Sequence, residues 1–179
     1  MKSYKEDIFR YYGKYKENLK EKIFRPLGLK YIILFRKCQN TKIPILKLYY
    51  ILRLRLLSKK TLIQIPYNTK IGKGFYIGHY GRIIINPKAI IGKNVNIATG
   101  VTIGQENRGK RKGTPTIGNN VWIGTNSVIV GKITIGNDVL IAPLSYVNFD
   151  VPDHSIVIGN PGKIIKKEEA TKESINKMI

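Results

Sequence analysis

A six-residue repeat runs through residues 61–165 and constrains the fold more than any other feature of the sequence. An aliphatic residue, often followed by glycine, opens each of thirteen units: Ile65, Ile71, Ile77, Ile85, Ile91, Ile97, Ile103, Ile117, Ile123, Ile129, Ile135, Ile141 and Val147. This period fits neither an α-helix nor a strand meander and is typical of a parallel β-helix, in which three units form one coil. The aliphatic residues should then stack as a buried column, and thirteen units predict about four coils.

The repeat keeps its phase except at two places. It slips by two residues between Ile77 and Ile85, and by eight residues between Ile103 and Ile117. Insertions in repeats of this kind form loops. The longer slip, residues 106–113, is therefore predicted to project as a loop. Its basic residues make it either a solvated loop or a flap across a binding cleft.

Three regions follow from this pattern: a basic helical segment at residues 1–60, the β-helix at residues 61–165 and a tail at residues 166–179. The first region has apolar residues at mixed three- and four-residue spacing, which predicts helices over residues 3–24 and 29–60. Because a solenoid has open ends, we expect these helices to cap one end. The tail is expected at the other end, as a helix or a frayed strand.

Pro26 and Gly28 are predicted to separate the two helices, and Pro44 to interrupt the second. The run that follows, Ile45–Leu57, is apolar with Lys and Arg interleaved. Two interpretations of it remain open. It either packs on the rest of the subunit, with basic stems lying over apolar surface, or rests on an anionic membrane.

The net charge of +21 is concentrated in residues 1–60, which contain 17 Lys and Arg against 4 Asp and Glu. Such a segment should associate with polyanions, and charge alone does not choose among nucleic acid, acidic lipid and phosphate-bearing ligands. A nucleic-acid-binding scaffold is disfavoured, since the sequence contains no recognised nucleic-acid motif.

The single cysteine, Cys38, excludes an intrachain disulfide and favours a reducing compartment. The first ten residues lack the apolar core of a signal peptide, and no apolar stretch reaches about 18 residues. We therefore expect a cytoplasmic protein, peripheral at the inner membrane face if residues 1–60 bind lipid. Two histidines and one cysteine, scattered along the sequence, predict no metal site.

Five stretches of the repeat region match a known family: Ile77–Asn86, Gly100–Gly104, Thr114–Gly118, Val121–Gly124 and Gly159–Ile165. Through them the chain resembles the hexapeptide-repeat acyltransferases, most closely the serine acetyltransferase and polysaccharide O-acetyltransferase branch. The resemblance implies a left-handed parallel β-helix, here with an α-helical N-terminal segment. It also implies a homotrimer with its active sites between neighbouring subunits, and acetyl-CoA as the acyl donor.

The same resemblance assigns the role of general base to His79. A hydroxyl is a poor nucleophile, and an imidazole with a pKa near 6.5 suits the removal of its proton. His79 lies at a predicted corner between Gly78 and Gly81; without the resemblance it would be a surface histidine at a turn. Transfer in this family is direct, so Cys38 is not expected to act as a nucleophile. The second histidine, His154, is predicted to lie at the surface.

Cofactor contacts are implied by the resemblance as well. The pantetheine arm of the coenzyme would follow the corner at Thr125, Ser127 and Ala142, and Lys163 would lie near the adenosine phosphates. Trp122 corresponds to a tryptophan that lines the thioester pocket in sugar acetyltransferases, although its ring could equally cover a face of the prism.

Acceptor contacts are expected from Tyr80, Asn86 and Arg108. Tyr80 adjoins the predicted base, and Asn86 could orient either the acceptor or His79. Arg108 belongs to the basic insertion, whose charge would suit the phosphates of coenzyme A or a glycan substrate.

Three departures from the family pattern bear on the chemical identity of the acceptor. Serine acetyltransferases of this branch have acidic residues at the positions of Gln64 and Gly78, and a histidine at that of Thr114. Without these groups the charges of an amino acid lose their partners. We therefore expect a sugar hydroxyl of a capsule, exopolysaccharide or lipopolysaccharide precursor, offered as a glycan or sugar nucleotide. The alternatives are a serine O-acetyltransferase, a non-catalytic β-helix scaffold and a polyanion-binding protein. Because the acidic residues are absent, a backbone carbonyl or an asparagine would orient His79 in place of the missing carboxylate.

Overall fold

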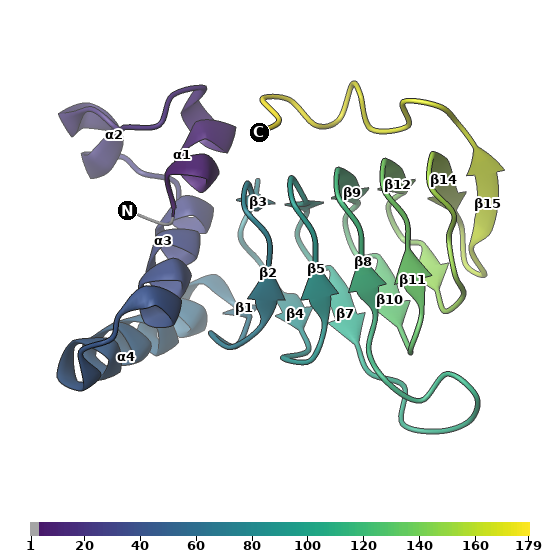
Figure 1. The fold of residues 1–179 in the computed structure, drawn as a ribbon, viewed down its shortest axis with the longest axis horizontal. Helices are drawn as coiled ribbons and strands as arrows, with labels where there is room; N and C mark the ends of the chain where they lie inside the picture. The colour runs from purple at the N-terminus through teal and green to yellow at the C-terminus, as the bar shows by residue number, and fades with distance from the viewer. Residues whose placement is uncertain (1–3) are drawn as a thin grey trace.

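The computed structural model describes residues 4–179 and shows a helical segment seated on one end of a β-helix (Figure 1). Four helices lie within these residues: α1 (Lys5–Tyr12), α2 (Leu19–Ile23), α3 (Leu27–Asn40) and α4 (Pro44–Thr61). Within residues 4–179, no helix is both long enough and apolar enough to cross a membrane.

The strands form three sheets, one along each side of the coil. Sheet A contains β1 (Ile63–Gln64), β4 (Ile83–Ile85), β7 (Thr102–Gly104), β10 (Val128–Val130) and β13 (Tyr146–Val147). Sheet B contains β2 (Lys70–Ile71), β5 (Ile90–Ile91), β8 (Thr116–Ile117) and β11 (Thr134–Ile135). Sheet C contains β3 (Tyr76–Ile77), β6 (Asn96–Ile97), β9 (Val121–Ile123), β12 (Val139–Ile141), β14 (Ser155–Ile158) and β15 (Lys163–Lys166). All pairings are parallel except that of β14 with β15.

The predicted parallel β-helix is confirmed by this topology. The thirteen residues that open the repeat units point inward and are buried, apart from the partly buried Ile71. The structure has about five coils, one more than expected. The fifth consists of β13, a bridge at Val151 and β14, and its polar turn at residues 152–154 hides the period in the sequence.

The two phase slips lie where the sequence placed them. Strand register advances by 20 residues from Ile63 to Ile83, then by 18 from Ile84 to Thr102. It advances by 26 residues across the coil that contains the longer slip, which projects as a loop (Figure 1). Both insertions therefore leave the stacked strands in register.

The N-terminal helices differ from the expectation in two ways. The helix predicted over residues 3–24 is divided into α1 and α2, because α1 ends at Gly13 with φ at +71°. Gly28 lies inside α3 rather than in a break. Its missing side chain lets α3 approach β3 closely, since a Cβ there would lie 2.4 Å from the carbonyl oxygen of Ile77.

These helices cap the open edge of the first coil with polar side chains. The Tyr31 hydroxyl bonds both the N–H and the C=O of Ile65, at 3.1 Å each. The Asp7 carboxylate accepts the N–H of Phe75 at 2.9 Å, and Arg36 donates to the carbonyl of Ile71 at 2.7 Å. Backbone groups that lack a preceding strand are therefore satisfied by side chains.

The far end is closed differently. Strand β15 pairs antiparallel with β14 and covers the last coil, as the expected strand would. The rest of the tail does not stay there: it runs back over the coils to the helical end (Figure 1). Asp138 accepts the amides of Ala170 and Thr171 at 3.0 Å, and Lys177 donates to the carbonyl of Tyr11 at 2.9 Å.

Candidate active site

The residues between the end of each sheet C strand and the start of the next sheet A strand form one long edge of the prism, here called the CA edge. The pairing of Ile77 with Ile97, Ile97 with Ile123, and Ile123 with Ile141 aligns the residues that follow them. His79, Thr99, Thr125 and Pro143 are therefore stacked in coils 1 to 4, at a spacing of about 4.8 Å per coil.

His79 is exposed at the first position of the CA edge. The two-residue slip supplies the extra chain that forms its corner, and Gly81 makes the turn possible with φ at +155°. A Cβ on Gly81 would lie 2.0 Å from Oγ1 of Thr99. The sequence signal for this corner was the slip itself, whereas the contact with Thr99 had no sequence signal.

No hydrogen bond or ion pair reaches the His79 imidazole from within residues 4–179. The expectation that an asparagine or a backbone carbonyl of the same chain orients the ring is therefore not met in one protomer. Asn86 in particular lies at the opposite end of β4, and its Oδ1 accepts the N–H of Lys88 at 2.9 Å. Its side chain stabilises its own turn and does not reach His79.

Helix α1 holds the strand that leads into His79. The Tyr11 hydroxyl donates to the carbonyl of Ile77 at 2.7 Å and accepts the N–H of Ile77 at 3.1 Å. The Tyr11 ring also packs against Tyr76, with the ring centroids 4.5 Å apart. Burial raises the pKa of Tyr11 well above its usual value, so the hydroxyl stays protonated and can donate. Sequence reasoning missed Tyr11, because a tyrosine in an apolar helix pattern carries no sign of this contact.

Thr125, Ser127 and Ala142 belong to the CA edge, and Lys163 opens β15 at the same side of the last coil. Thr125 and Ala142 are partly exposed, and Lys163 is exposed at the start of β15 beside coil 5. Ser127 is fully buried, and its hydroxyl donates to the carbonyl of Ala142 at 3.0 Å. Ser127 therefore supports the edge from behind. From His79 after β3 to Lys163 in β15, the path crosses five strand spacings of sheet C, or about 24 Å.

Trp122 lies on the outer face of sheet C, in register between Asn96 and Leu140. It is partly exposed and precedes the CA edge by two residues. This position is compatible with either expected role, a wall beside the thioester or a cover for the sheet.

The remaining predicted residues divide between two edges. Tyr80 is 54% exposed beside His79 on the CA edge. Arg108 lies in the projecting loop, which leaves sheet A at the opposite edge, here called the AB edge. A bridge between Glu106 and Gly113 closes the loop, and a hollow of about 430 Å³ is lined by Glu106, Arg108 and Arg111. Within one protomer, sheet A separates this loop from His79.

A larger hollow of about 590 Å³ lies between the outer face of sheet A and helix α4. Gln64 and Asn86 line it from sheet A and its edge, and Arg55 and Ser58 line it from α4. Its walls are neutral apart from Arg55. It lies near the first coil, where Gln64 faces outward in β1.

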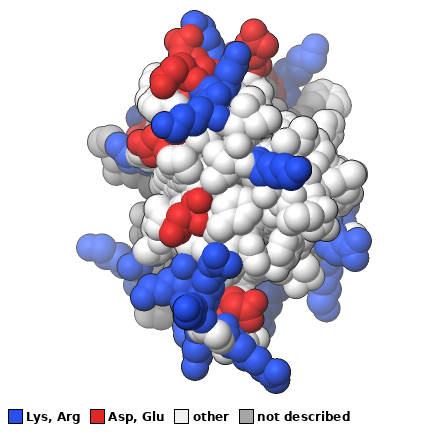
Figure 2. Space-filling model, turned by 90° about the vertical axis from the view of Figure 1, so that its right-hand side faces the viewer, with Lys and Arg blue, Asp and Glu red and all other residues white. Residues whose placement is uncertain are grey.

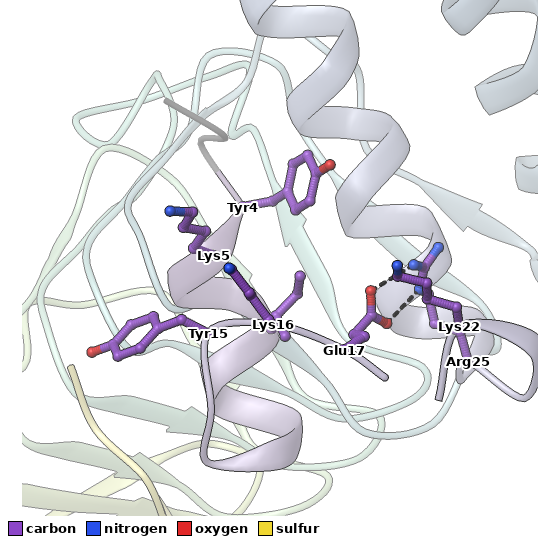
Figure 3. Close-up of a pocket in the computed structure, with 8 residues that line it drawn as sticks. Tyr4, Lys5, Tyr15, Lys16, Glu17, Lys22 and Arg25 are labelled. Atoms are coloured by element: carbon purple, nitrogen blue, oxygen red, sulfur yellow. Dashed lines mark hydrogen bonds and ion pairs between the residues drawn. The ribbon is translucent and has the colours of Figure 1, made fainter. Parts of the chain in front are cut away.

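A third hollow, of about 400 Å³, lies among the first helices, and none of its described lining residues is a histidine (Figure 3). Its one carboxylate, Glu17, is paired with Arg25 at 2.6 Å. Three lysines also line it: Lys5, Lys16 and Lys22. Since these residues belong to the helical segment, this hollow is separate from the CA edge.

Cys38 and His154 lie outside the CA edge. Burial raises the pKa of Cys38 to about 11, so its thiol is protonated and non-nucleophilic at neutral pH. His154 is half-exposed at a corner, with Nδ1 2.9 Å from Asp138. Among residues 4–179, no group of three His, Cys, Asp or Glu side chains could hold a metal ion.

Comparison with known proteins shows which proteins this chain is similar to. Residues 114–148 match the family described as bacterial transferase hexapeptide (six repeats). A serine acetyltransferase of Staphylococcus epidermidis is 42% identical over 108 residues, covering 60% of this chain and 51% of the relative. One from Bacillus pumilus is 36% identical over 121 residues, covering 66% and 56%. The chain thus spans about half the length of these curated relatives.

Solved structures give the same result for the fold. The serine acetyltransferase of Neisseria gonorrhoeae in complex with serine has a TM-score of 0.71 and 26% identity, covering 92% of this chain and 68% of that one. The Brucella abortus serine acetyltransferase in complex with coenzyme A has a TM-score of 0.78 and 24% identity, covering 93% and 67%. The left-handed β-helix expected from the sequence is the fold of these proteins.

Proposed function

Since this chain carries the hexapeptide repeat of the bacterial transferases and folds as the left-handed β-helix of the serine acetyltransferases, we propose that it is an O-acetyltransferase with His79 as the general base. The observation that supports this most is the CA edge. It aligns an exposed imidazole with Thr125, Ala142 and Lys163, residues that lie far apart in the sequence.

The proposed reaction is a direct transfer. The His79 imidazole removes the proton of the acceptor hydroxyl while the oxygen attacks the thioester carbonyl of acetyl-CoA. The tetrahedral intermediate collapses, the carbon–sulfur bond breaks, and the coenzyme thiolate takes the proton back from the imidazolium. Because none of residues 4–179 of its own protomer bonds the His79 imidazole, its orientation depends on the acceptor or a neighbouring subunit.

Acetyl-CoA would lie along the CA edge. The thioester would sit at His79, the pantetheine arm would pass Thr125 and Ala142, and the phosphates would approach Lys163. The solved relative that contains coenzyme A supports a coenzyme as co-substrate. Trp122, on the adjoining face, would then border the thioester.

A homotrimer would complete the site. His79 and the loop of Arg108 lie on opposite edges of sheet A, so one protomer cannot bring them together. If the CA edge of one subunit faces the AB edge of the next, the contact is heterologous and closes as a ring. Each of the three clefts would then contain His79 from one subunit and Arg108 from its neighbour.

The acceptor is proposed to be a sugar hydroxyl. An amino acid acceptor brings an ammonium and a carboxylate, and burying them without partners costs several kcal/mol. The chain offers Gln64, Gly78 and Thr114 at the three positions discussed above, and it has no Asp or Glu between Glu21 and Glu106. A neutral polyhydroxylated acceptor needs none of these charges.

Serine is the second candidate acceptor, and the names of the relatives favour it. All of the relatives described above are serine acetyltransferases, and one was solved with serine bound. The two acceptors differ in a testable way. If the missing groups exclude serine, Gln64→Asp, Gly78→Asp and Thr114→His together should raise kcat/KM for serine.

The decisive experiment measures release of coenzyme thiol from acetyl-CoA with UDP-sugars, lipid-linked oligosaccharides and serine as acceptors. His79→Ala should lower the rate with the preferred acceptor by at least about 10²-fold and leave the oligomeric state unchanged. His154→Ala, at the other histidine, should have no effect. Unchanged activity of His79→Ala would remove the assignment, and a preference for serine would replace the sugar.

A further inference from the structure

Helix α4 presents to solvent an apolar stripe that no other part of residues 4–179 covers. Four of its residues recur at three- and four-residue spacing on one face: Ile45, Leu48, Leu52 and Leu56, exposed by 79, 56, 50 and 67%. The opposite face carries Ile51, Leu54 and Leu57, which pack against the core. The helix is therefore apolar on both faces, and burial within the subunit explains only one of them.

Basic side chains flank the stripe on both sides. At 100° per residue, Arg53 and Arg55 lie about 80° to either side of Ile45. Lys59 and Lys60 follow in the last turn. Long basic side chains at the borders of an apolar face can reach from an apolar layer to its charged surface.

A groove of about 490 Å³ between α3 and α4 adjoins the stripe through Leu56. Among the described residues, its lining contains five cationic side chains and no acidic one: Arg25, Lys30, Lys37, Arg53 and Lys60. The charge of Arg25 is balanced by its ion pair with Glu17, and the other four cationic residues leave the groove positive. Because the sequence has no Asp or Glu between Glu21 and Glu106, α3 and α4 carry no negative charge at all. The opposite end of the molecule mixes acidic with basic side chains (Figure 2).

We propose that α4 binds flat to an anionic phospholipid bilayer, with the stripe among the acyl chains and lipid phosphates in the α3–α4 groove. Charge favours a bilayer, rather than a second copy of the chain, as the partner of this surface. Two copies meeting through this face would bring together two surfaces that each carry an excess of positive charge, whereas a bilayer offers apolar chains and negative charge at the same surface. The proposal does not depend on the acetyl transfer proposed above.

The test is flotation of the full chain with vesicles of phosphatidylcholine alone or of equimolar phosphatidylcholine and phosphatidylglycerol. The protein should float with the anionic vesicles, and added salt should weaken this binding. Leu52→Gln with Leu56→Gln should lower the partition coefficient at least about tenfold. Ile164→Gln with Ile165→Gln, at exposed positions of β15, is the matched control and should leave it unchanged.

A second pair of variants tests the groove. Arg53→Gln with Lys60→Gln should weaken binding to anionic vesicles, whereas Lys166→Gln with Lys167→Gln should have no effect. At constant ionic strength, inorganic phosphate should not compete, because the site requires phosphate within a bilayer.

Three results would overturn the proposal: equal recovery with neutral and anionic vesicles, unchanged partition of the Leu52/Leu56 variant, or a smaller oligomer formed by that variant in solution. The last result would make the stripe a contact between copies of the chain. Acetyl transfer to a soluble acceptor should persist in the Leu52/Leu56 variant, which separates this proposal from the catalytic one.

Discussion

The two ends of the β-helix solve the same physical problem by different means. At the helical end, Asp7, Tyr11, Tyr31 and Arg36 bond backbone groups of the first coil that have no strand before them. At the far end, β15 satisfies the last coil with its own backbone. A side-chain cap depends on a few residues in fixed positions, whereas a strand cap tolerates almost any side chain. Damage by single substitutions should therefore concentrate at the helical end.

The difference matters for function because the CA edge runs between the two caps. Tyr11 holds the strand that leads into His79 at one end, and the turn before β15 places Lys163 at the other. Each cap thus supports one end of the proposed coenzyme path. Breaking either cap should affect stability and one identifiable step of the reaction.

The largest loss of stability is expected for Arg36→Met. Arg36 and Asp7 form a buried ion pair at 2.9 Å, with side chains 7 and 0% exposed, and Arg36 also bonds the carbonyls of Ile71 and Gly72. Removal of one partner leaves a buried charge uncompensated and should cost about 3–5 kcal/mol in the free energy of unfolding. Thermal or urea unfolding measures this loss.

A double variant tests the explanation. Asp7→Leu combined with Arg36→Met should be more stable than Arg36→Met alone, because no carboxylate is then left without its partner. Arg55→Met, at an exposed position on α4, should leave stability within about 0.5 kcal/mol of the unaltered protein. A double variant as unstable as the sum of both single changes would contradict the ion-pair argument.

The second-largest loss of stability is expected for Tyr11→Phe, which leaves the N–H and C=O of Ile77 without their partner. Two unsatisfied backbone groups should cost about 2–4 kcal/mol. His79 follows Ile77 by two residues, so kcat should fall by about tenfold or more, while KM for acetyl-CoA stays constant. Tyr12→Phe, one residue along the same helix, is the control. Equal losses in both variants would show that the hydroxyl of Tyr11 has no positioning role.

The contrast between the periodic coils and the side-chain cap also explains which parts of the structure could be predicted from the sequence. The coils were predictable because their buried residues recur every six positions, and the two phase slips located both the corner of His79 and the loop of Arg108. The side-chain cap has no period. Gly28 was expected in the break between two helices, yet it lies within α3 where a Cβ would meet Ile77. Asn86 was expected near His79, but one three-residue strand places them at opposite edges.

At the far end, Gly162→Ala should have a smaller effect on stability. Its Cβ would lie 2.7 Å from the carbonyl oxygen of Tyr146, which accepts the N–H of Gly162 at 3.0 Å. Displacing this turn should cost about 1–3 kcal/mol. Because Lys163 follows directly, KM for acetyl-CoA should rise while kcat changes little. A change confined to kcat would mean that this turn does not contribute to coenzyme binding.

The smallest effect is expected where the tail is held on the coils, at Asp138. Partial burial favours its neutral form, but hydrogen bonds from Thr171, His154 and the amide of Ala170 outweigh this and hold the pKa of Asp138 below 3.8. The same carboxylate raises the pKa of His154 above 6.5. Tail contacts that depend on ionised Asp138 are lost as pH falls through its lowered pKa. His154 Nδ1 also lies 3.4 Å from the Glu168 carboxylate of the tail. This contact depends on protonated His154 and is lost as pH rises through its raised pKa, so the tail is held best between about pH 4 and 6.5.

Hydrogen exchange at the amides of Ala170 and Thr171 measures directly how firmly Asp138 binds the tail. Asp138→Asn should lower their protection by about tenfold, the change expected for loss of one hydrogen bond to a charged acceptor. Asp153→Asn is the matched control, since its carboxylate accepts the amide of Asn137 at 2.7 Å and does not touch the tail. The global unfolding transition should hardly move, because β15 closes the last coil without help from the tail. If Asp138→Asn instead destabilised the whole chain as much as Tyr11→Phe, the far end would depend on side chains too, and the contrast between the two caps would fail.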